Sequence, residues 1–555
     1  MAEYDLIVRN ARIVDGTGAA AVQGDVGVRG GRIADIGRVD GDADQVIDAD
    51  GQILAPGFID IHTHFDPQLC WDGLATPSIE HGVTTVVIGN CSLSLAPVLG
   101  DGSDKIVSMF GVTEDIKKPT FDEAVPFCWE SFGEYLDFIR PSLGINVAAL
   151  IGHSALRYYV MGAQSQERTA TPDELARMCE LVEEAMAAGA AGISSSYVDV
   201  DENMRPVPSR FADKEEKIAL ARAMAKSGRG VWQVVPYFPD IKEELANIRE
   251  LGDISIEAGV LCSLQPVLSS PTSPKATEIL EALEAERARG ARVFGQVMPR
   301  CFDMNMRLAE TSMLLFALPT WKGIMDLPKT ERTARFADPE MRSKLVEEMK
   351  NAQGMSGALP FLTVGEVRSE ENQGYRGRFL SEIAESEGKE LGELILDISL
   401  REDLNAEFKL TNVLNADKAS VAELIEHPLL HFGASDAGAH ITQFCGTGDT
   451  THMLEHYVRE TNRLSLERAV HRMTGEVAAD WGLHDRGTLE VGKAADMVLF
   501  DIDRVSCGQE EFVDDFPGEA SRYVRRSDGY GAVIVNGSVV WEDGRYTESR
   551  SGQVV

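Results

Sequence analysis

The sequence lacks the features of a disulfide-framed or membrane-spanning protein. Its eight cysteines among 555 residues are scattered, with no Cys-x-x-Cys pair, and this usage is typical of a reducing compartment. No apolar run approaches the roughly 20 residues that span a bilayer, and the first residues contain no basic segment followed by an apolar one. We therefore expect a cytoplasmic protein with no membrane partner.

Basic residues are also scarce. The chain has 53 Lys and Arg against 89 Asp and Glu, which gives a formal net charge of −36 at pH 7. Such an excess repels nucleic-acid backbones and anionic membranes at long range. With 44% hydrophobic and 26% charged residues, the composition is that of a globular protein with a large core. The expected partner is a small molecule, with no nucleic acid, and association into a homo-oligomer remains open.

Both ends of the chain are predicted to be rich in β-strands. Short apolar runs at residues 26–29 and 32–36 flank Gly30-Gly31, and runs at 532–535 and 538–541 flank Asn536-Gly537. Each pair of runs predicts a β-hairpin. Because short strands need one another to bury a face, we expect one small β-sandwich domain built from residues 1–55 and 488–555.

The middle of the chain changes to strands followed by helices. One helix is well marked, with Thr171 as N-cap, Glu174 completing a capping box and Gly189 after the last turn. Repeated β/α units of this kind predict an α/β protein with a (β/α)8 barrel of the TIM type over residues 56–487. A stretch at about 300–349, rich in Met, Arg and Glu, interrupts the pattern and is predicted to be an insertion, a candidate cover for the barrel mouth.

Three segments carry candidate metal ligands. His62 and His64 stand two apart at the end of a predicted strand, so their side chains share a face and could bind one ion. Cys91 and Asp436 each follow another predicted strand, where a thiolate could join the metal and a carboxylate could bind it or accept a proton from its water. Each has a simpler reading: unrelated histidines, a packed cysteine and a turn-capping aspartate.

Taken in order, these segments resemble the amidohydrolase superfamily and, within it, the N-acyl-D-amino-acid deacylase (D-aminoacylase) family. The stretches that carry the resemblance are 55–64, 82–97, 146–157, 435–436, 456–460 and 487–501. The resemblance implies a metal-dependent hydrolase in which one or two divalent ions, zinc in the family, are bound through Cys91 and the histidine pair. It also implies that Asp436 acts as the acid/base.

The chain departs from the family at two barrel strands. Family members carry a zinc-binding histidine after the fifth strand and another after the sixth, whereas residues 231–236 and 262–266 contain no histidine. The family's basic and tyrosine residues for the substrate carboxylate are not evident either. The candidate substrate-binding residues are then His153, Trp232, Gln265 and His440, of which His153 is equally compatible with a packed strand-end histidine.

The leading hypothesis is a metal-dependent amidohydrolase that cleaves an N-acyl bond of a neutral or hydrophobic amide with a metal-activated water, Asp436 moving the proton to the leaving nitrogen. The alternatives are an N-acyl-D-amino-acid deacylase proper, a hydrolase of cyclic amides or lactones, and a metal-free pseudo-enzyme that only binds ligands. Retention of His62, His64, Cys91 and Asp436 together argues against the last.

Overall fold

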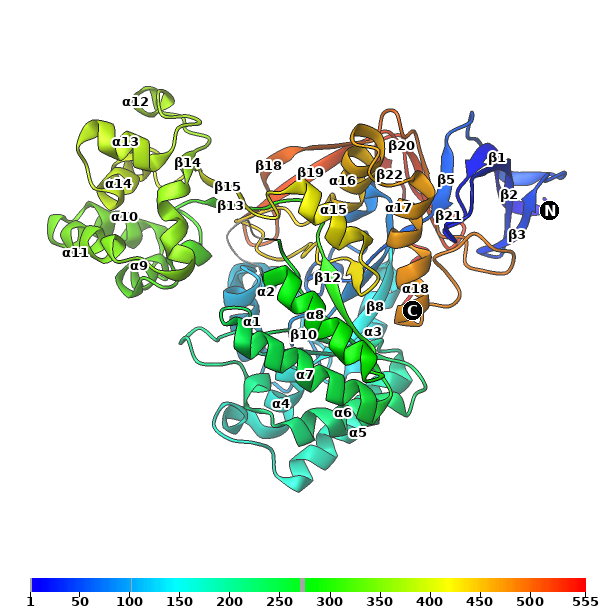
Figure 1. The fold of residues 1–555 in the computed structure, drawn as a ribbon, viewed down its shortest axis with the longest axis horizontal. Helices are drawn as coiled ribbons and strands as arrows, with labels where there is room; N and C mark the ends of the chain where they lie inside the picture. The colour runs from blue at the N-terminus through cyan, green and yellow to red at the C-terminus, as the bar shows by residue number, and fades with distance from the viewer. Residues whose placement is uncertain (1, 101, 270–274) are drawn as a thin grey trace.

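The computed structural model describes residues 2–100, 102–269 and 275–555 (Figure 1). Its central feature within these ranges is a sheet of eight parallel strands. In sheet order the strands are β6 (Phe58–Asp60), β7 (Val83–Ile88), β8 (Asn146–Gly152), β9 (Gly192–Ser196), β10 (Val231–Val235), β11 (Leu261–Leu264), β12 (Val293–Val297) and β16 (Leu430–Phe432). All but one of their residues are buried, as expected of parallel strands covered on both faces.

The two edge strands of this sheet meet just beyond their carboxyl ends. His64 N donates to Ala437 O at 2.7 Å and Asp436 N donates to His62 O at 3.1 Å, beside a parallel bridge between Thr63 and Ala437. The segments after β6 and β16 therefore close the sheet, and the (β/α)8 barrel predicted from the sequence is confirmed. The predicted metal ligands lie at this closure.

Helices of the β/α units pack around the barrel. The main ones are α3 (Phe132–Ile139), α4 (His153–Met161), α5 (Pro172–Ala188), α6 (Lys214–Ala225), α7 (Ile241–Ala258), α8 (Lys275–Ala288), α15 (Lys418–Glu426), α17 (Leu466–Met473) and α18 (Gly475–Trp481). The start and end of α5 confirm the sequence prediction: Thr171 and Glu174 form a capping box, and Gly189 ends the helix at φ 119°. Such local signals fix helix boundaries because they satisfy backbone groups that the helix leaves unpaired.

The two ends of the chain share one sheet. Its described strands are β1 (Tyr4–Ile13), β2 (Val22–Arg29), β3 (Arg32–Gly37), β4 (Ala43–Asp48), β5 (Ile53–Pro56), β17 (Met497–Phe500), β20 (Tyr530–Val535), β21 (Ser538–Glu542) and β22 (Arg545–Tyr546). Antiparallel pairing of β5 with β17 joins the two halves. Both predicted hairpins form, β2 with β3 and β20 with β21, so the β-rich terminal domain expected from the sequence is confirmed.

A separate lobe interrupts the barrel between β12 and β16. It contains β13 (Phe302–Met306), α9 (Pro319–Met325), α10 (Lys329–Ala337), α11 (Pro339–Lys350), β14 (Thr363–Val364), α12 (Glu370–Gln373), α13 (Leu380–Glu387), α14 (Leu391–Arg401) and β15 (Phe408–Leu414). It has a hydrophobic core of its own around Trp321, Phe336 and Phe408, and Figure 1 shows it at the side of the barrel. The lobe continues well beyond residue 349, the expected end of the insertion.

A long hairpin from the C-terminal part reaches this lobe. Its strands are β18 (Ser506–Phe516) and β19 (Ala520–Asp528), which lie between the lobe and the terminal sheet in Figure 1. Tyr523 N donates to Ile441 O at 2.8 Å, and its hydroxyl donates to Glu407 of the lobe at 2.5 Å. The hairpin thus ties the loops after β16 to the inserted lobe.

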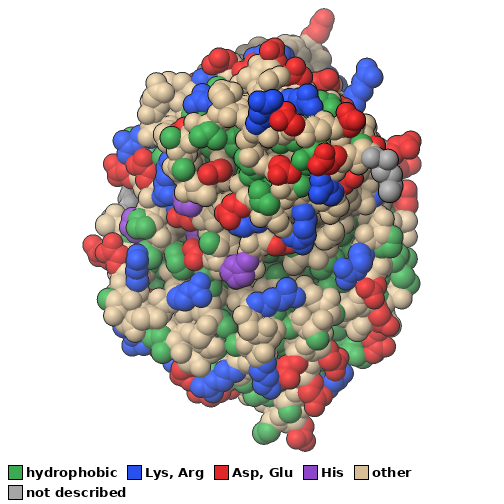
Figure 2. All heavy atoms as spheres, turned by 90° about the vertical axis from the view of Figure 1, so that its right-hand side faces the viewer, with side chains coloured by type: hydrophobic (Ala, Val, Ile, Leu, Met, Phe, Trp, Pro, Cys, Tyr) green, Lys and Arg blue, Asp and Glu red, His purple; other side chains and the backbone are tan. Residues whose placement is uncertain are grey.

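Positive and negative side chains are interspersed on the face of the molecule drawn in Figure 2. On that face the acidic excess of the sequence is not gathered into one patch. None of the helices in the described ranges combines the length and apolar character needed to cross a bilayer.

Candidate metal centre

The histidine pair lies at the carboxyl end of β6, with its side chains directed at one point. His62 and His64 are almost completely buried, and their Nε2 atoms are 3.3 Å apart. This follows from the strand geometry, because residues two apart in an extended chain project from the same face. The metal-binding geometry expected for the pair is therefore available in the fold.

Cys91 reaches the same point from the loop after β7. Its Sγ lies 3.4 Å from Nε2 of His62 and 3.5 Å from Nε2 of His64. The backbone of Cys91 is left-handed, with φ 55°, and its amide donates to Gln233 Oε1 at 3.4 Å. This tight turn redirects the chain at the strand end, so that the thiol points into the barrel mouth and not into the outer core.

Asp436 completes the cluster from the loop after β16. Its Oδ1 is 3.1 Å from Nε2 of His64 and 3.5 Å from Nε2 of His62. The preceding residue, Ser435, donates a hydrogen bond to Asp60 Oδ2 at 2.6 Å, which anchors the loop to β6. Ligands from the first and last strands of the barrel thus meet where the sheet closes.

The donor atoms around the two histidines have separations close to those of a tetrahedral site. Ligands of a four-coordinate zinc, at about 2.0–2.3 Å from the ion, lie about 3.3–3.6 Å from one another. The Nε2 atoms of His62 and His64 lie 3.1 to 3.5 Å from each other, from Cys91 Sγ and from Asp436 Oδ1. Imidazole, thiolate and carboxylate are also the donor types that zinc accepts. The residues present therefore fit a divalent transition metal.

Burial and neighbouring charges shift the pKa values of these ligands in opposite directions. Burial, only partly opposed by Asp436, lowers the pKa of His62 to about 3 and keeps its imidazole neutral. Burial also disfavours the charged form of His64, but the carboxylates of Glu114 and Asp436 outweigh it and raise the pKa to about 9. Asp436 is itself buried, yet its histidine neighbours hold its pKa well below the ordinary value. It is therefore ionised at neutral pH.

Glu114 is a member of the cluster that sequence reasoning missed. Its side chain is 1% exposed and Oε1 lies 3.4 Å from Nδ1 of His64. Together with His64 and Asp436 it forms a second set of potential metal donors. No motif marks Glu114, which follows α1 (Gly102–Thr113), far from both histidines in the sequence.

Two of the four predicted substrate-binding residues lie beside the metal ligands. The amide Nε2 of Gln265 donates toward Cys91 Sγ at 3.5 Å. His440 Nε2 is 3.6 Å from Asp436 Oδ2, and its side chain keeps 14% exposure. Both side chains therefore lie against the predicted metal ligands.

The other two predicted residues are packed inside the protein. His153 is fully buried, with Nδ1 3.0 Å from Ser195 Oγ and Nε2 2.9 Å from Glu216 Oε1. Trp232 is also fully buried and packs edge-on against the His153 ring. The contacts of these two side chains are with Ser195, Glu216 and each other and not with the metal ligands.

Two further polar residues lie near the cluster and were not singled out in the sequence. Asp199 follows β9, and its buried Oδ2 has no hydrogen-bond partner among the described residues. Burial raises the pKa of Asp199 to about 6, with opposing contributions from His64 and Arg210. Arg210 donates to the carbonyls of Val198 and Asp199 at 2.9 and 3.2 Å, and its guanidinium lies over the Tyr237 ring.

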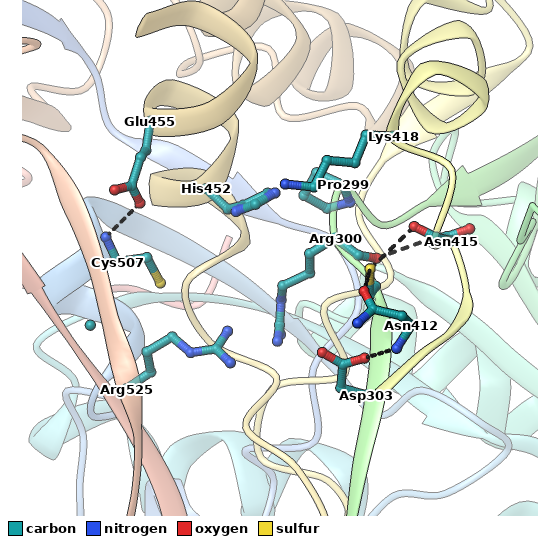
Figure 3. Close-up of a pocket in the computed structure, with 12 residues that line it drawn as sticks. Pro299, Arg300, Asp303, Asn412, Asn415, Lys418, His452, Glu455, Cys507 and Arg525 are labelled. Carbon is teal, nitrogen blue, oxygen red and sulfur yellow. Dashed lines mark hydrogen bonds between the residues drawn. The ribbon is translucent and has the colours of Figure 1, made fainter. Parts of the chain in front are cut away.

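The two arginines just after the seventh barrel strand are engaged elsewhere. Arg300 pairs with Asp449 and donates to the carbonyls of Cys445 and Gly446. It lines a cavity of about 310 Å³ together with His452, Lys418 and Arg525, which Figure 3 shows between the hairpin strand and the segment after β12. Arg307 pairs with Glu407 of the lobe at 3.0 Å. Neither guanidinium is directed at the metal ligands.

The fold and the ligand set together define a barrel hydrolase of the metal-dependent class. Comparison with known families agrees: the amidohydrolase family matches residues 45–312 and 324–541, so the chain belongs to that family. It is a hydrolase of carbon–nitrogen bonds other than peptide bonds, as the sequence predicted.

Individual relatives cover the whole chain. The D-aminoacylase of Alcaligenes xylosoxydans xylosoxydans is 29% identical over 561 residues, covering 100% of this chain and 97% of its own. The N-acyl-D-aspartate deacylase of the same organism is 29% identical over 563 residues, covering 100% and 95%. A D-aminoacylase mutant solved in complex with CuCl2 superposes with a TM-score of 0.67 at 28% identity, covering 100% of this chain and 99% of that one. The predicted resemblance to D-aminoacylases is confirmed, and metal is present in a related structure.

Proposed function

We propose that the protein hydrolyses the N-acyl bond of a neutral or hydrophobic amide, with zinc held by His62, His64, Cys91 and Asp436. The observation that carries the proposal is that the two histidine Nε2 atoms lie 3.1–3.5 Å from each other, from Cys91 Sγ and from Asp436 Oδ1, at the carboxyl end of a barrel, where enzymes of this fold place their chemistry. The free state of all eight cysteines suits a reducing compartment, and we place the protein in the cytoplasm.

Each residue of the site has a separate role in the proposed reaction. A bound divalent ion supplies a Lewis acid for the scissile carbonyl and lowers the pKa of the attacking water. His62 and Cys91 hold the ion, and Asp436, kept ionised by its histidine neighbours, accepts the proton of the water and returns it to the leaving nitrogen. His440, 3.6 Å from Oδ2 of Asp436, orients that carboxylate, and Gln265 offers an amide to the substrate.

The electrostatics of the mouth favour a substrate without a free carboxylate. Four acidic side chains, those of Glu114, Asp199, Asp436 and Asp66, act on Cys91, and no lysine or arginine is among the main influences on it. Arg300 and Arg307, which follow the seventh barrel strand, are both engaged in buried ion pairs and do not form a carboxylate clamp. A desolvated carboxylate placed here without a partner would face like charge, which costs several kcal/mol.

A matched pair of substrates tests this preference. N-acetyl-D-phenylalanine and its C-terminal amide differ in one charge, and acetate release reports deacylation of both. We expect kcat/KM to be higher for the neutral amide by more than about tenfold, equivalent to 1.4 kcal/mol. A preference for the acid would contradict the neutral-substrate proposal while leaving the metal site intact.

Arg210 supports a second candidate, an N-acyl-D-amino-acid deacylase proper. It is partly buried near Asp199, and the relatives named above act, by their names, on D-aminoacyl and N-acyl-D-aspartate substrates. If the acid is the better substrate, Arg210→Gln should remove that preference. If the amide is better, Arg210→Gln should change both substrates alike.

A further inference from the structure

We propose that Glu114 is the outer partner of the metal ligand His64, accepting a hydrogen bond from its Nδ1–H and so holding Nε2 ready for the ion. This inference rests on the proposed metal site and goes beyond it. Glu114 is a positioning residue, because it acts on the metal through His64 and not by direct contact with the substrate.

The two nitrogens of His64 face different groups. Nε2 is directed at the cluster, 3.1 Å from Asp436 Oδ1 and 3.5 Å from Cys91 Sγ. Nδ1 is directed away from it, toward Glu114 Oε1 at 3.4 Å. An imidazole that binds an ion through Nε2 carries its proton on Nδ1. In this tautomer the Nδ1–H group of His64 can donate a hydrogen bond to Glu114.

The buried carboxyl group of Glu114 is incompletely hydrogen-bonded. Its Oε1 is buried and has no hydrogen-bond partner in the described part of the chain, apart from the His64 contact at 3.4 Å. A buried carboxylate that lacks full pairing is costly to the folded state. Packing alone therefore does not explain an acid here, since a neutral side chain of the same shape would fill the space equally well.

The loop that carries Glu114 is fixed from both sides. Its amide donates to Phe110 O at 2.9 Å, and its carbonyl accepts from His440 N at 2.6 Å. The next residue, Asp115, accepts from Thr442 through both the backbone amide and the hydroxyl. The loop after α1 is thus bonded to the segment that follows Asp436, which aligns the Glu114 carboxylate with His64.

His62 provides an internal contrast. The uncharged amide of Gln296 lies beside it, and neither Nδ1 of His62 nor Oε1 of Gln296 has a hydrogen-bond partner among the described residues. The Nε2 amide of Gln296 donates to Ser263 Oγ at 3.0 Å, which leaves its oxygen to face the histidine. A carboxylate partner makes an imidazole a stronger donor to the metal than a neutral partner does. His64, not His62, is therefore the ligand whose strength depends on a charged outer residue.

The test is a zinc-affinity measurement on apo protein, by chelator competition, for Glu114→Ala and the isosteric Glu114→Gln. We expect the zinc dissociation constant to rise by about 10–100-fold in Glu114→Ala, and by less in Glu114→Gln, which keeps an acceptor but not the charge. Glu244→Gln is the matched control, a buried carboxylate on α7 that takes no part in the loop after α1; its zinc affinity should stay within about threefold of the parent.

Thermal unfolding of the apo proteins separates positioning from simple structural support. We expect apo Glu114→Gln to keep a cooperative unfolding transition, because glutamine fills the same space as glutamate, while its zinc affinity falls. Unchanged zinc affinity in both Glu114 variants would overturn the proposal. Loss of apo stability without a specific loss of zinc affinity would do the same.

Stoichiometry distinguishes the remaining outcomes. A parent that binds two equivalents of zinc and a Glu114→Ala variant that binds one would make Glu114 a direct ligand of a second ion, which contradicts the positioning role. A parent that binds no zinc would refute the proposed metal site itself, whereas a zinc-binding parent with an indifferent Glu114 refutes only this inference.

Discussion

Removal of the Glu216 carboxylate should destabilise the barrel strongly, because it is the anion of a buried network. Glu216 on α6 contacts His153 at 2.9 Å and Arg157 Nη1, and the side chains of these two residues are fully buried. Among the described residues, Glu216→Ala leaves the Arg157 guanidinium with the carbonyls of Ser165 and Arg168 as its hydrogen-bond acceptors. Removing one partner of a buried ion pair costs about 3–5 kcal/mol.

The titration of Glu216 gives an independent magnitude. Burial by itself raises the pKa of the carboxyl, but the hydrogen bond from His153 and the Arg157 guanidinium outweigh it and lower the pKa from 4.5 to about 2. At 1.36 kcal/mol per pKa unit, this difference corresponds to about 3 kcal/mol of stabilisation. Because the folded-state pKa is below the unfolded value, the stabilisation is complete above pH 4.5 and is lost as the pH falls through 2.

Urea unfolding at pH 7 and at pH 3, followed by tryptophan fluorescence, measures both effects. We expect Glu216→Ala to lower the free energy of unfolding at pH 7 by about 3–5 kcal/mol, and the difference from the parent to shrink at pH 3. Glu215→Gln, at the exposed neighbouring position, is the control and should change stability by no more than about 0.5 kcal/mol. A Glu216→Ala variant within about 1 kcal/mol of the parent at pH 7 would refute the reasoning.

Three further substitutions test the site. Asp436→Asn should reduce kcat by about 10²–10⁴-fold without loss of folding, because the proton acceptor is gone; retention of half the activity on any identified substrate would disprove its role. Cys91→Ser should raise the zinc dissociation constant by about tenfold or more, since a hydroxyl is a poorer zinc donor than a thiolate, as chelator competition can measure. Gly89→Ala should destabilise the fold by more than about 1 kcal/mol in urea titration, because its Cβ would lie 2.0 Å from the Leu150 carbonyl oxygen at φ 78°; an unchanged midpoint would contradict the structure of this turn.

Local signals made much of the fold predictable. The capping box at Thr171 and Glu174 and the Asn536-Gly537 turn act over a few residues, so the sequence alone specifies them. The direction of His62 and His64 was predictable for the same reason, since the period of a strand places alternate side chains on one face. Cys91 and Asp436 were ambiguous one at a time and became candidates through the ordered resemblance to a family.

The remaining features depend on contacts between distant segments. Glu114 meets His64 only because the loop after α1 is bonded to the segment around His440, which no spacing rule encodes. His153 was expected near the mouth as a strand-end residue, but it begins α4 and turns toward Glu216 of α6. The second half of the lobe, up to β15, was not recognised as part of the insertion because its helices look like those of the barrel in sequence. Its separate hydrophobic core distinguishes it from the barrel, and that core is visible in the structure alone.

Metal content of the purified protein tests the central claim most directly. After expression in metal-replete medium, elemental analysis of the parent should find about one equivalent or more of a divalent transition metal, and of a variant with both His62→Ala and His64→Ala close to none. A parent with less than about a tenth of an equivalent, or a double variant that keeps the parent's metal content, would contradict the account of this site.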